Sequence, residues 1–434
     1  MAVHPQAPSV PGRERTWRTY APGALAGTGA LHRRIVTDLI AAVAEMKGAQ
    51  AAQRLRAAGI EFLHTVIDPL DIGPLRDRVL EPLRGELLKL ALTVGRSALG
   101  WADEFYVDDY VVLRINLPYD VAKAADGAAE NPGIGRVSPS MRAAADARRV
   151  KDPVYDPRAY HRGHPPAAWA HGPHVDSWTG HSRDGSNVWW AICDVPAEAG
   201  MVLYPELAGE TLPCDRSTLY LQRGYPLPPP TYVPLAAGEM LVFDPEILHG
   251  THLNVTERTR VAVSLRLNAR RPVFDPDCFY AREFWHAAAD IAAGRLDTVL
   301  HLKREDHLAA ATTAPALAPR TALATVQAQP DAAGRFVTVG PSALVGEGER
   351  IVVVLPGRRV LLSRRDGALF ALDAACPHYG LDLADGGARG ATVYCPGCAV
   401  GFDLATGRSA SPSLALTTFA VREDGGTIVL DLSA

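Results

Sequence analysis

The stretch Gly172-Pro-His-Val-Asp-Ser-Trp178 places a histidine, His174, and a carboxylate, Asp176, one residue apart. On an extended strand, side chains two positions apart project to the same face, so both could bind one ion. A third ligand must come from elsewhere in the chain. His249 follows the apolar run Glu239–Phe243, a buried-strand pattern that would carry it to the interior of a β structure. The pattern predicts a metal site made of these three side chains.

The chemistry of this ligand set points to iron. Two histidines and one carboxylate on one face of an octahedral ion leave three positions open, as in non-haem Fe(II) oxygenases. Two positions can chelate a 2-oxo acid, and one can take dioxygen. Arg260 begins a later apolar run, and its planar guanidinium could bind the distal carboxylate of such a co-substrate through two hydrogen bonds. Such bonds contribute about 1.5 to 3 kcal/mol, enough to select a dicarboxylate.

Two alternatives to this assignment stay open. His174 and Asp176 could form a buried hydrogen-bonded pair without a metal, because this triplet also occurs by chance. His252 could replace His249 as the third ligand, although the spacing to Asn254 favours His249. The remaining histidines of this region are expected to be loop or substrate-contact residues: His161, His164, His171 and His181.

The central part of the chain has the pattern of a β sandwich or barrel. The expected strands are short apolar runs: Tyr110–Ile115, Asn187–Cys193, Met201–Tyr204, Ser217–Leu221, Met240–Phe243 and Arg260–Leu267. Helical periodicity precedes them in Leu31–Met46 and Leu75–Leu99, and helix is expected again in Asp277–Leu308. The polar insert between Pro118 and Gly172 is too long for a plain connector and predicts a lid or substrate loop.

Together, His174-x-Asp176, His249-Gly-Thr-x-x-Asn254 and Arg260 resemble the 2-oxoglutarate-dependent Fe(II) dioxygenases, especially their phytanoyl-CoA-hydroxylase-like branch. The resemblance covers about Tyr110–Asn268. It implies a double-stranded β-helix, or jelly roll, with helical flanks. It also implies that His174, Asp176 and His249 are iron ligands and that Arg260 anchors 2-oxoglutarate. Halogenating relatives lack the carboxylate, so Asp176 favours hydroxylation or a related oxidation.

The C-terminal region predicts a second, small all-β domain. Ala309–Gly334 is dominated by Ala, Thr and Pro and is typical of a flexible linker. We therefore expect a dioxygenase domain in residues 1–308, a linker in 309–335 and a second domain in 336–434. The last hundred residues are rich in short strands separated by turn residues.

A second ligand set lies in this domain. Cys376-Pro-His378, then Cys395-Pro-Gly-Cys398 after sixteen residues, resembles a Rieske [2Fe-2S] ferredoxin domain from about Phe336 to the C-terminus. By position, Cys376 and Cys395 would bind one iron, and His378 and Cys398 the other. The chain departs from the family at Cys398, which stands where the second histidine is expected. A thiolate there adds negative charge and should lower the reduction potential, because Rieske centres owe their high potentials to histidine ligands.

Three interpretations of this second site remain open. A [2Fe-2S] cluster with three cysteines and one histidine keeps the site of the fold. Zn²⁺ also accepts such ligands. A degenerate domain would bind nothing.

The composition limits the classes of function. With 434 residues, 47% of them hydrophobic, the chain can form two packed cores. The net charge of -4 is small and no long basic run is present, so nucleic acid is not an expected partner. Met1–Arg18 contains no apolar stretch typical of a signal peptide or membrane span, so we expect a cytoplasmic protein without a membrane partner. The clustered cysteines favour metal binding over disulfides.

The expected substrate is a small polar metabolite or natural-product intermediate, oxidised with O₂, and a redox partner is compatible with the second domain. The side chains that could line the pocket follow the HxD triplet or lie on predicted strands: Trp178, Arg183, Asn187, Trp189, Trp190, Arg114 and Arg266. Of these, Arg114 and Arg266 are possible anchors for an acidic group or for the other end of the co-substrate, and Asn187 is a further candidate for binding the co-substrate. Two other functions are compatible with the sequence: a Rieske-type oxygenase whose cluster donates electrons, and a non-catalytic redox or ligand sensor.

Overall fold

The computed structural model describes residues 16–102, 104–125, 157–161, 163–179, 181–273, 285–297 and 323–433. The chain forms two compact units. Unit 1 comprises Met1–Tyr220 and Tyr232–Leu317, and unit 2 comprises Leu221–Thr231 and Ala318–Ala434. Both units are rich in strands, and the helices that are described lie in unit 1 apart from short 3-10 turns. The expected mainly β fold with helical flanks is confirmed.

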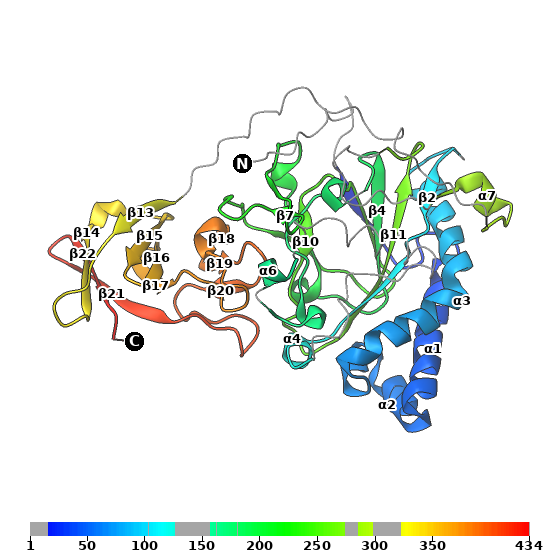
Figure 1. The fold of residues 1–434 in the computed structure, drawn as a ribbon, viewed down its shortest axis with the longest axis horizontal. Helices are drawn as coiled ribbons and strands as arrows, with labels where there is room; N and C mark the ends of the chain where they lie inside the picture. The colour runs from blue at the N-terminus through cyan, green and yellow to red at the C-terminus, as the bar shows by residue number, and fades with distance from the viewer. Residues whose placement is uncertain are drawn as a thin grey trace. The chain divides into compact units, whose positions relative to one another are not determined.

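Unit 1 is built on a seven-stranded antiparallel sheet (Figure 1). In spatial order its strands are β1 (Trp17–Tyr20), β9 (Met240–Phe243), β4 (Gly185–Ala191), β11 (Arg260–Asn268), β2 (Tyr106–Asp108) and β12 (Trp285–Ala287), with β3 (Val112–Asn116) also paired to β11. The apolar runs that predicted strands in this part of the sequence form β3, β4, β9 and β11. Strand β1 was not expected, and it covers the edge of β9.

A smaller sheet supplies the second layer. It consists of β10 (His249–Thr251), β5 (Met201–Leu203) and β8 (Thr231–Val233), and a separate pair is formed by β6 (Cys214–Asp215) and β7 (Tyr220–Leu221). Apolar side chains from both sheets share one core. Trp189, Leu241 and Phe243 of the large sheet pack with Met201 and Leu203 of the small one. This two-layered arrangement agrees with the expected jelly roll.

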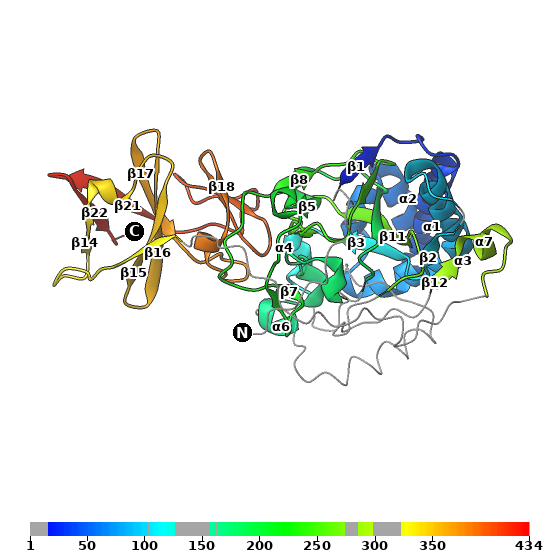
Figure 2. The same cartoon turned by 90° about the horizontal axis from the view of Figure 1, so that it is seen from above.

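Helices flank the large sheet (Figure 2). They are α1 (Thr28–Lys47), α2 (Ala49–Ala58) and α3 (Ile72–Thr93), and α3 packs on β2, β3 and β11. The helices predicted in Leu31–Met46 and Leu75–Leu99 are confirmed, although the second ends in a π turn over Val94–Ala98. Among the described residues, the structure has no helix of the length and apolar character that crossing a membrane requires.

The continuous helix expected in Asp277–Leu308 is wrong at Trp285–Ala287. These residues form β12, which pairs with β2, and helix α7 covers Ala288–Ala292. Pairing with an open sheet edge has overridden the helical pattern of the sequence. Residues 277–284 and 298–308 lie outside the described residues.

Most of the predicted lid also lies outside the described residues. Its described parts contain α4 (Tyr119–Ala122), α6 (Pro157–His161) and a 3-10 turn at Pro166–Ala168.

Unit 2 contains a second seven-stranded sheet and a small three-stranded sheet. The large sheet has the order β13 (Ala324–Gln327), β15 (Arg350–Leu355), β16 (Arg358–Arg365), β17 (Ala368–Asp373), β21 (Thr418–Asp424), β22 (Thr427–Asp431) and β14 (Phe336–Pro341). The small sheet contains β18 (Ala388–Arg389), β19 (Thr392–Tyr394) and β20 (Gly401–Asp403). The core lies inside the large sheet, around Val337, Val353, Leu362 and Ile428.

Two stretches of unit 2 precede Phe336. Strand β13 lies within the stretch expected to be a linker and pairs in parallel with β15, whereas residues 309–322 of that stretch lie outside the described residues. The segment Leu221–Thr231 also belongs to unit 2. Its Leu227 N–H donates to the carbonyl oxygen of Asp385 at 2.7 Å, and the Gly224 N–H donates to the Asp385 carboxylate at 3.1 Å.

Candidate metal centres

Backbone pairing brings the first ligand set together. His174 and His249 form an isolated antiparallel bridge, with N–H to carbonyl distances of 2.8 and 2.9 Å. His249 begins β10, whereas Asp176 begins a 3-10 turn, Asp176–Thr179, and its N–H donates to the Pro245 carbonyl at 2.9 Å. The expectation that His174 and Asp176 lie on one extended strand is therefore wrong, because His174 has strand pairing whereas Asp176 lies in a 3-10 turn.

The three side chains converge on one point. The Asp176 Oδ1 atom lies 3.4 Å from His174 Nε2 and 3.7 Å from His249 Nε2. The Nδ1 atoms of the two histidines each lie 2.8 Å from a backbone carbonyl, of Gly172 and Ile247 respectively. Nδ1 therefore donates in each ring, and both Nε2 lone pairs are left free for an ion. All three residues are buried.

The second oxygen of Asp176 is held from the other side. Asn187 Nδ2 donates to Oδ2 at 2.7 Å, and Arg266 Nε lies 3.6 Å from the same oxygen. Burial alone would raise the pKa of Asp176, but interactions with His181, Arg266 and the two histidines of the set outweigh it and hold the pKa well below its usual value. The carboxylate is thus ionised and oriented with one oxygen toward the histidines. Asn187, a candidate for binding the co-substrate, holds the Asp176 carboxylate in this orientation.

His249 is suited to binding an ion as a neutral ring. Burial, together with the neighbouring His174, lowers the pKa of His249 to about 3. His252, the rival ligand, is not part of the converging group, and its ring packs edge-on against Tyr232 with centroids 5.3 Å apart.

The other four histidines lie outside the converging group, and of these His161 ends helix α6. His161 stacks on Trp169, His164 packs beside Tyr119, the His171 ring lies 5.7 Å from that of His174, and the His181 N–H donates to the Asp176 carbonyl.

Arg260 lies on the inner face of β11 and is buried. Its Nη1 donates to the Ala199 carbonyl at 2.5 Å, its Nη2 donates to Asn116 Oδ1, and its guanidinium lies over the Trp189 ring, 5.6 Å from the centroid. Burial, reinforced by the charge of Arg114, lowers the pKa of Arg260 to about 9. Among the described residues no carboxylate pairs with this cation. A buried guanidinium without a counter-ion is suited to an anionic ligand.

The residues that follow His249 explain how Arg260 is positioned. A side chain at Gly250 would place its Cβ 2.7 Å from the His171 carbonyl, so glycine is required by the close approach of two backbones. Asn254 Nδ2 donates to the carbonyls of Asn116 and Arg258 at 3.0 and 2.8 Å, which ties this loop to the end of β3. Asn254 thus holds the end of β3, where Asn116 accepts a hydrogen bond from Arg260.

Two of the remaining pocket candidates, Trp189 and Trp190, lie on opposite faces of the large sheet. Trp189 faces the inner core, whereas Trp190 faces outward, with its Nε1 donating to the Gly238 carbonyl at 3.1 Å and its ring beside His32. Arg114 Nε donates to Ser264 Oγ at 2.6 Å. Arg183 Nε lies 4.0 Å from Glu246 Oε2. Trp178 lies in the 3-10 turn with its side chain buried.

Tyr220 was not identified from the sequence as a residue of the site. Its hydroxyl lies 3.5 Å from both His161 Nε2 and His171 Nδ1, and its ring packs edge-on against His174 with centroids 6.0 Å apart. Of the strand expected at Ser217–Leu221, only Tyr220–Leu221 is formed, and residues 217–219 form a turn. The contacts of Tyr220 come from residues more than forty positions away, so no local pattern could identify it.

In unit 2, two loops of the same geometry carry the second ligand set. In residues 376–381 and again in 395–400, the N–H of the first residue donates to the carbonyl of the sixth, and the N–H of the fifth donates to the carbonyl of the first. The fifth residues, Gly380 and Ala399, have positive φ angles of 61° and 59°. Each loop thus turns tightly around a cysteine, Cys376 or Cys395.

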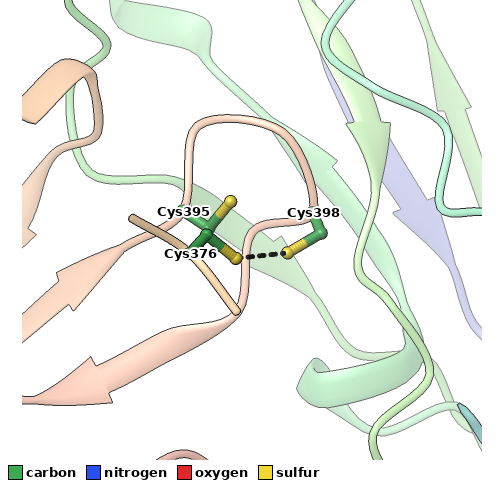
Figure 3. Close-up of side chains that lie close together, drawn as sticks. All are labelled: Cys376, Cys395 and Cys398. Atoms are coloured by element: carbon green, nitrogen blue, oxygen red, sulfur yellow. Dashed lines mark hydrogen bonds between the residues drawn. The ribbon is translucent and has the colours of Figure 1, made fainter. Parts of the chain in front are cut away.

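Three thiols from these loops converge (Figure 3). The sulfur atoms of Cys376, Cys395 and Cys398 lie within 4.8 Å of one another, and those of Cys376 and Cys398 are 3.9 Å apart. His378, expected as the fourth ligand, is buried on the first loop with its ring stacked on Tyr379 at 3.7 Å and lies outside the group of three. The donor set fits a thiolate-ligated metal centre.

The three thiols differ in the direction in which their surroundings shift the pKa. Burial opposes ionisation of Cys376, but hydrogen bonds from Cys395 and Cys398 outweigh it and lower the pKa of Cys376 well below its usual value. Burial and the neighbouring Cys376 raise the pKa of Cys395 and Cys398 well above theirs. One thiolate is thus stabilised by two thiols, and a bound cation would be needed to ionise the others.

Comparison with known proteins gives two family matches. Residues 118–262 match the phytanoyl-CoA dioxygenase family, and residues 335–419 match the Rieske [2Fe-2S] domain. Both lie where the sequence predicted them, and together they support an oxygenase that carries a Rieske module.

The C-terminal region is also similar to small ferredoxins. The chain is 30% identical over 91 residues to the ferredoxin component of the naphthalene 1,2-dioxygenase system of Pseudomonas aeruginosa, covering 20% of this chain and 88% of that protein. For the corresponding component of Pseudomonas putida the identity is 28%, covering 20% of this chain and 86% of that protein. Among solved structures, the ferredoxin of Sphingomonas yanoikuyae B1 matches with 27% identity and a TM-score of 0.21, covering 22% of this chain and 95% of that one.

Proposed function

This chain belongs to the phytanoyl-CoA dioxygenase family in its first part and to the Rieske [2Fe-2S] family in its last, and from that premise we propose that it is a 2-oxoglutarate-dependent Fe(II) oxygenase. The catalytic domain would be residues 1–308, and the Rieske-like domain, residues 336–434, would be an appended redox module. Because its second site depends on reduced thiols, we place the protein in the cytoplasm.

The observation that carries the proposal is the convergence of His174 Nε2, His249 Nε2 and Asp176 Oδ1, with both Nδ1 atoms tied to backbone carbonyls. Nitrogen and carboxylate donors of this kind, on one side of a point, suit ferrous iron with open positions. Among the described residues no carboxylate pairs with the buried Arg260, which supports a carboxylate of 2-oxoglutarate as its partner.

The residues of the chain would contribute positioning and electrostatics. Ferrous iron, once bound, supplies oxidation of the substrate by dioxygen at the expense of the 2-oxo acid. The Gly172 and Ile247 carbonyls hold the two imidazoles in the tautomer that leaves Nε2 free. Asn187 and Arg266 hold Asp176 so that a single oxygen faces the histidines. Arg260 would bind the distal carboxylate of the co-substrate.

Since Asp176 is retained, we propose hydroxylation rather than halogenation, on a small polar metabolite or natural-product intermediate. The test uses the full chain loaded with Fe(II) in the presence of O₂. We expect succinate to form from 2-oxoglutarate, faster with a substrate present, and to be lost in Asp176→Ala. Succinate formation that survives this substitution would refute the assignment.

The second site would hold a [2Fe-2S] cluster, with Zn²⁺ as the alternative. When bound, such a cluster supplies one-electron transfer, and we propose that the module keeps the mononuclear iron ferrous or docks a redox partner. The test is a Cys376→Ser variant in the full chain, which leaves the catalytic ligands intact. We expect the same initial rate but fewer turnovers before inactivation. An equal total number of turnovers before inactivation in wild type and Cys376→Ser would exclude a role of the module in supplying electrons.

A second candidate is an oxygenase that needs the cluster as its electron donor in every turnover. The match of residues 335–419 to the Rieske [2Fe-2S] domain, together with the similarity of 91 residues to the ferredoxin component of a naphthalene 1,2-dioxygenase system, favours it. In that case Cys376→Ser would abolish activity from the first turnover, and 2-oxoglutarate would not be consumed.

A further inference from the structure

The inner face of β11 carries cations at two separate places. Every second residue of β11 belongs to one set: Arg260, Ala262, Ser264 and Arg266. Ala262 of this set belongs to the inner core. Residues two apart on a strand share a face, so all four side chains point into the barrel. Arg260 and Arg266 are six residues apart, roughly 20 Å along an extended strand. The distal carboxylate held by Arg260 therefore cannot also neutralise Arg266.

Arg266 lies next to the proposed iron ligands. Its Nε is 3.6 Å from Asp176 Oδ2, and its guanidinium lies over the Tyr110 ring, 5.8 Å from the centroid. The side chain is only 11% exposed. Asn187, directly opposite Arg266 in the register of β4 and β11, donates to the same Asp176 oxygen at the shorter distance of 2.7 Å.

The guanidinium of Arg266 has unused hydrogen-bonding capacity. Within the described residues, its buried Nε and Nη1 atoms have no hydrogen-bond acceptor. Among the described residues, Asp176 is the carboxylate that pairs with Arg266. Because Asp176 Oδ1 faces the histidines, a bound iron ion would also take up part of the negative charge of Asp176. Arg266 then lacks an anion of its own, although a planar guanidinium is suited to two hydrogen bonds from a carboxylate or phosphate.

We infer that Arg266 binds an anionic group of the substrate, so that the oxidised molecule is an organic acid or phosphate ester. The inference rests on the proposed function, because it takes the position next to Asp176 to be the substrate side of the iron. Arg260 would bind the co-substrate, and Arg266 would bind and orient the substrate.

The binding test uses inorganic phosphate as the probe. It is titrated by calorimetry, without oxygen, into the full chain loaded with Fe(II) and 2-oxoglutarate. We expect the affinity for phosphate to fall at least tenfold in Arg266→Gln and less in Arg266→Lys, which keeps the charge. The matched control is Arg295→Gln, because Arg295 is an exposed partner of Asp290 and should have no effect. Equal phosphate binding by wild type and Arg266→Gln, or no binding by wild type, would overturn the inference.

The turnover test uses pairs of metabolites, each acid or phosphate ester beside its neutral amide or alcohol. We expect only the anionic members to accelerate succinate formation. Neutral members that accelerate it equally would overturn the inference, as would an Arg266→Gln variant in which only the half-saturating concentration of 2-oxoglutarate rises.

Two further outcomes separate the possible failures. If Arg266 merely positions Asp176, Arg266→Gln will weaken iron binding as Asn187→Ala does, without changing the preference for anions, and the inference falls. If phosphate binding depends on Arg266 but no succinate ever forms, the anion site stands as a binding site while its role as a substrate site falls with the proposed function.

Discussion

At the scale of single residues, Asp176 uses its two oxygens differently. Oδ1 faces His174 and His249, and Oδ2 is occupied by Asn187. The sequence predicted that these three side chains would come together, because their types and spacing are typical of an iron site. It could not predict the role of Asn187, because the contact depends on the register of β4 against the 3-10 turn that carries Asp176.

The first prediction concerns Asn187→Ala. Loss of the 2.7 Å hydrogen bond frees Asp176 to rotate, so Fe(II) affinity should fall about tenfold to a hundredfold. The measurement is a competition for Fe(II) between the protein and a coloured chelator. At saturating iron, the half-saturating concentration of 2-oxoglutarate should stay within about twofold of wild type, and a large increase there would show that Asn187 binds the co-substrate after all.

The second prediction concerns Arg260→Gln. Removing a charge-assisted contact worth about 1.5 to 3 kcal/mol should raise the half-saturating concentration of 2-oxoglutarate by about ten- to a hundredfold. Steady-state succinate formation measures it. Arg258→Gln is the control. The Arg258 side chain packs over Phe62, and the hydrogen bonds of Arg258 within the loop are made by its backbone N–H and C=O groups, which the substitution keeps. An unchanged value in Arg260→Gln would remove Arg260 as the anchor.

At the scale of elements, the two cysteine loops of unit 2 show what a motif can and cannot specify. The spacing of Cys376, His378, Cys395 and Cys398 predicted one site, and three of these side chains converge. That the loops share one hydrogen-bonding scheme could not be read from the sequence, since Gly380 and Ala399 occupy equivalent positive-φ positions with different residues.

The third prediction follows from the position of Cys398 in the second loop. Cys398→His should restore a neutral ligand and raise the reduction potential of a bound cluster by on the order of 100 mV, since histidine ligation accounts for the high potentials of Rieske centres. Redox titration followed by electron paramagnetic resonance measures the potential. Cys214→Ser, which changes a buried cysteine of unit 1, should leave it unaltered. A site that binds Zn²⁺ would give no such signal in either protein.

Strand positions in unit 1 were predicted better than helix positions after β11. Runs such as Met240–Phe243 are apolar on both faces, because they are buried between two layers, and this signal is local. Trp285–Ala287 is a strand only because β2 offers an open edge, and that edge is formed by residues far away in the sequence.

At the scale of the whole molecule, the division into two parts was predictable from the amino-acid composition. Which segments of the chain make up unit 2 was not predictable. The segment Leu221–Thr231 lies between two strands of the first part, and nothing in its sequence indicates that it joins the Rieske-like unit. There it packs so closely that a Cβ at Gly387 would lie 2.1 Å from the Pro229 nitrogen.

The fourth prediction tests this packing in the full chain. Gly387→Ala should destabilise unit 2 by about 1 to 3 kcal/mol, because the added methyl group has no space beside Pro228 and Pro229. Thermal unfolding followed by loss of metal-centre absorbance measures it. In the control Gly29→Ala, the new Cβ would meet only the end of Arg33 at 3.7 Å, so the unfolding temperature should hardly change. Equal temperatures for both variants would show that the segment does not pack on Gly387.

The most direct test of the central claim is an anaerobic titration of 2-oxoglutarate into the iron-loaded full chain, followed by visible absorption. If His174, Asp176 and His249 hold iron with open positions, the charge-transfer band of an Fe(II)–2-oxo acid chelate should grow to one equivalent per mononuclear iron and be absent in His249→Ala. A wild-type chain that binds iron but develops no such band, or a band that persists in His249→Ala, would contradict the account.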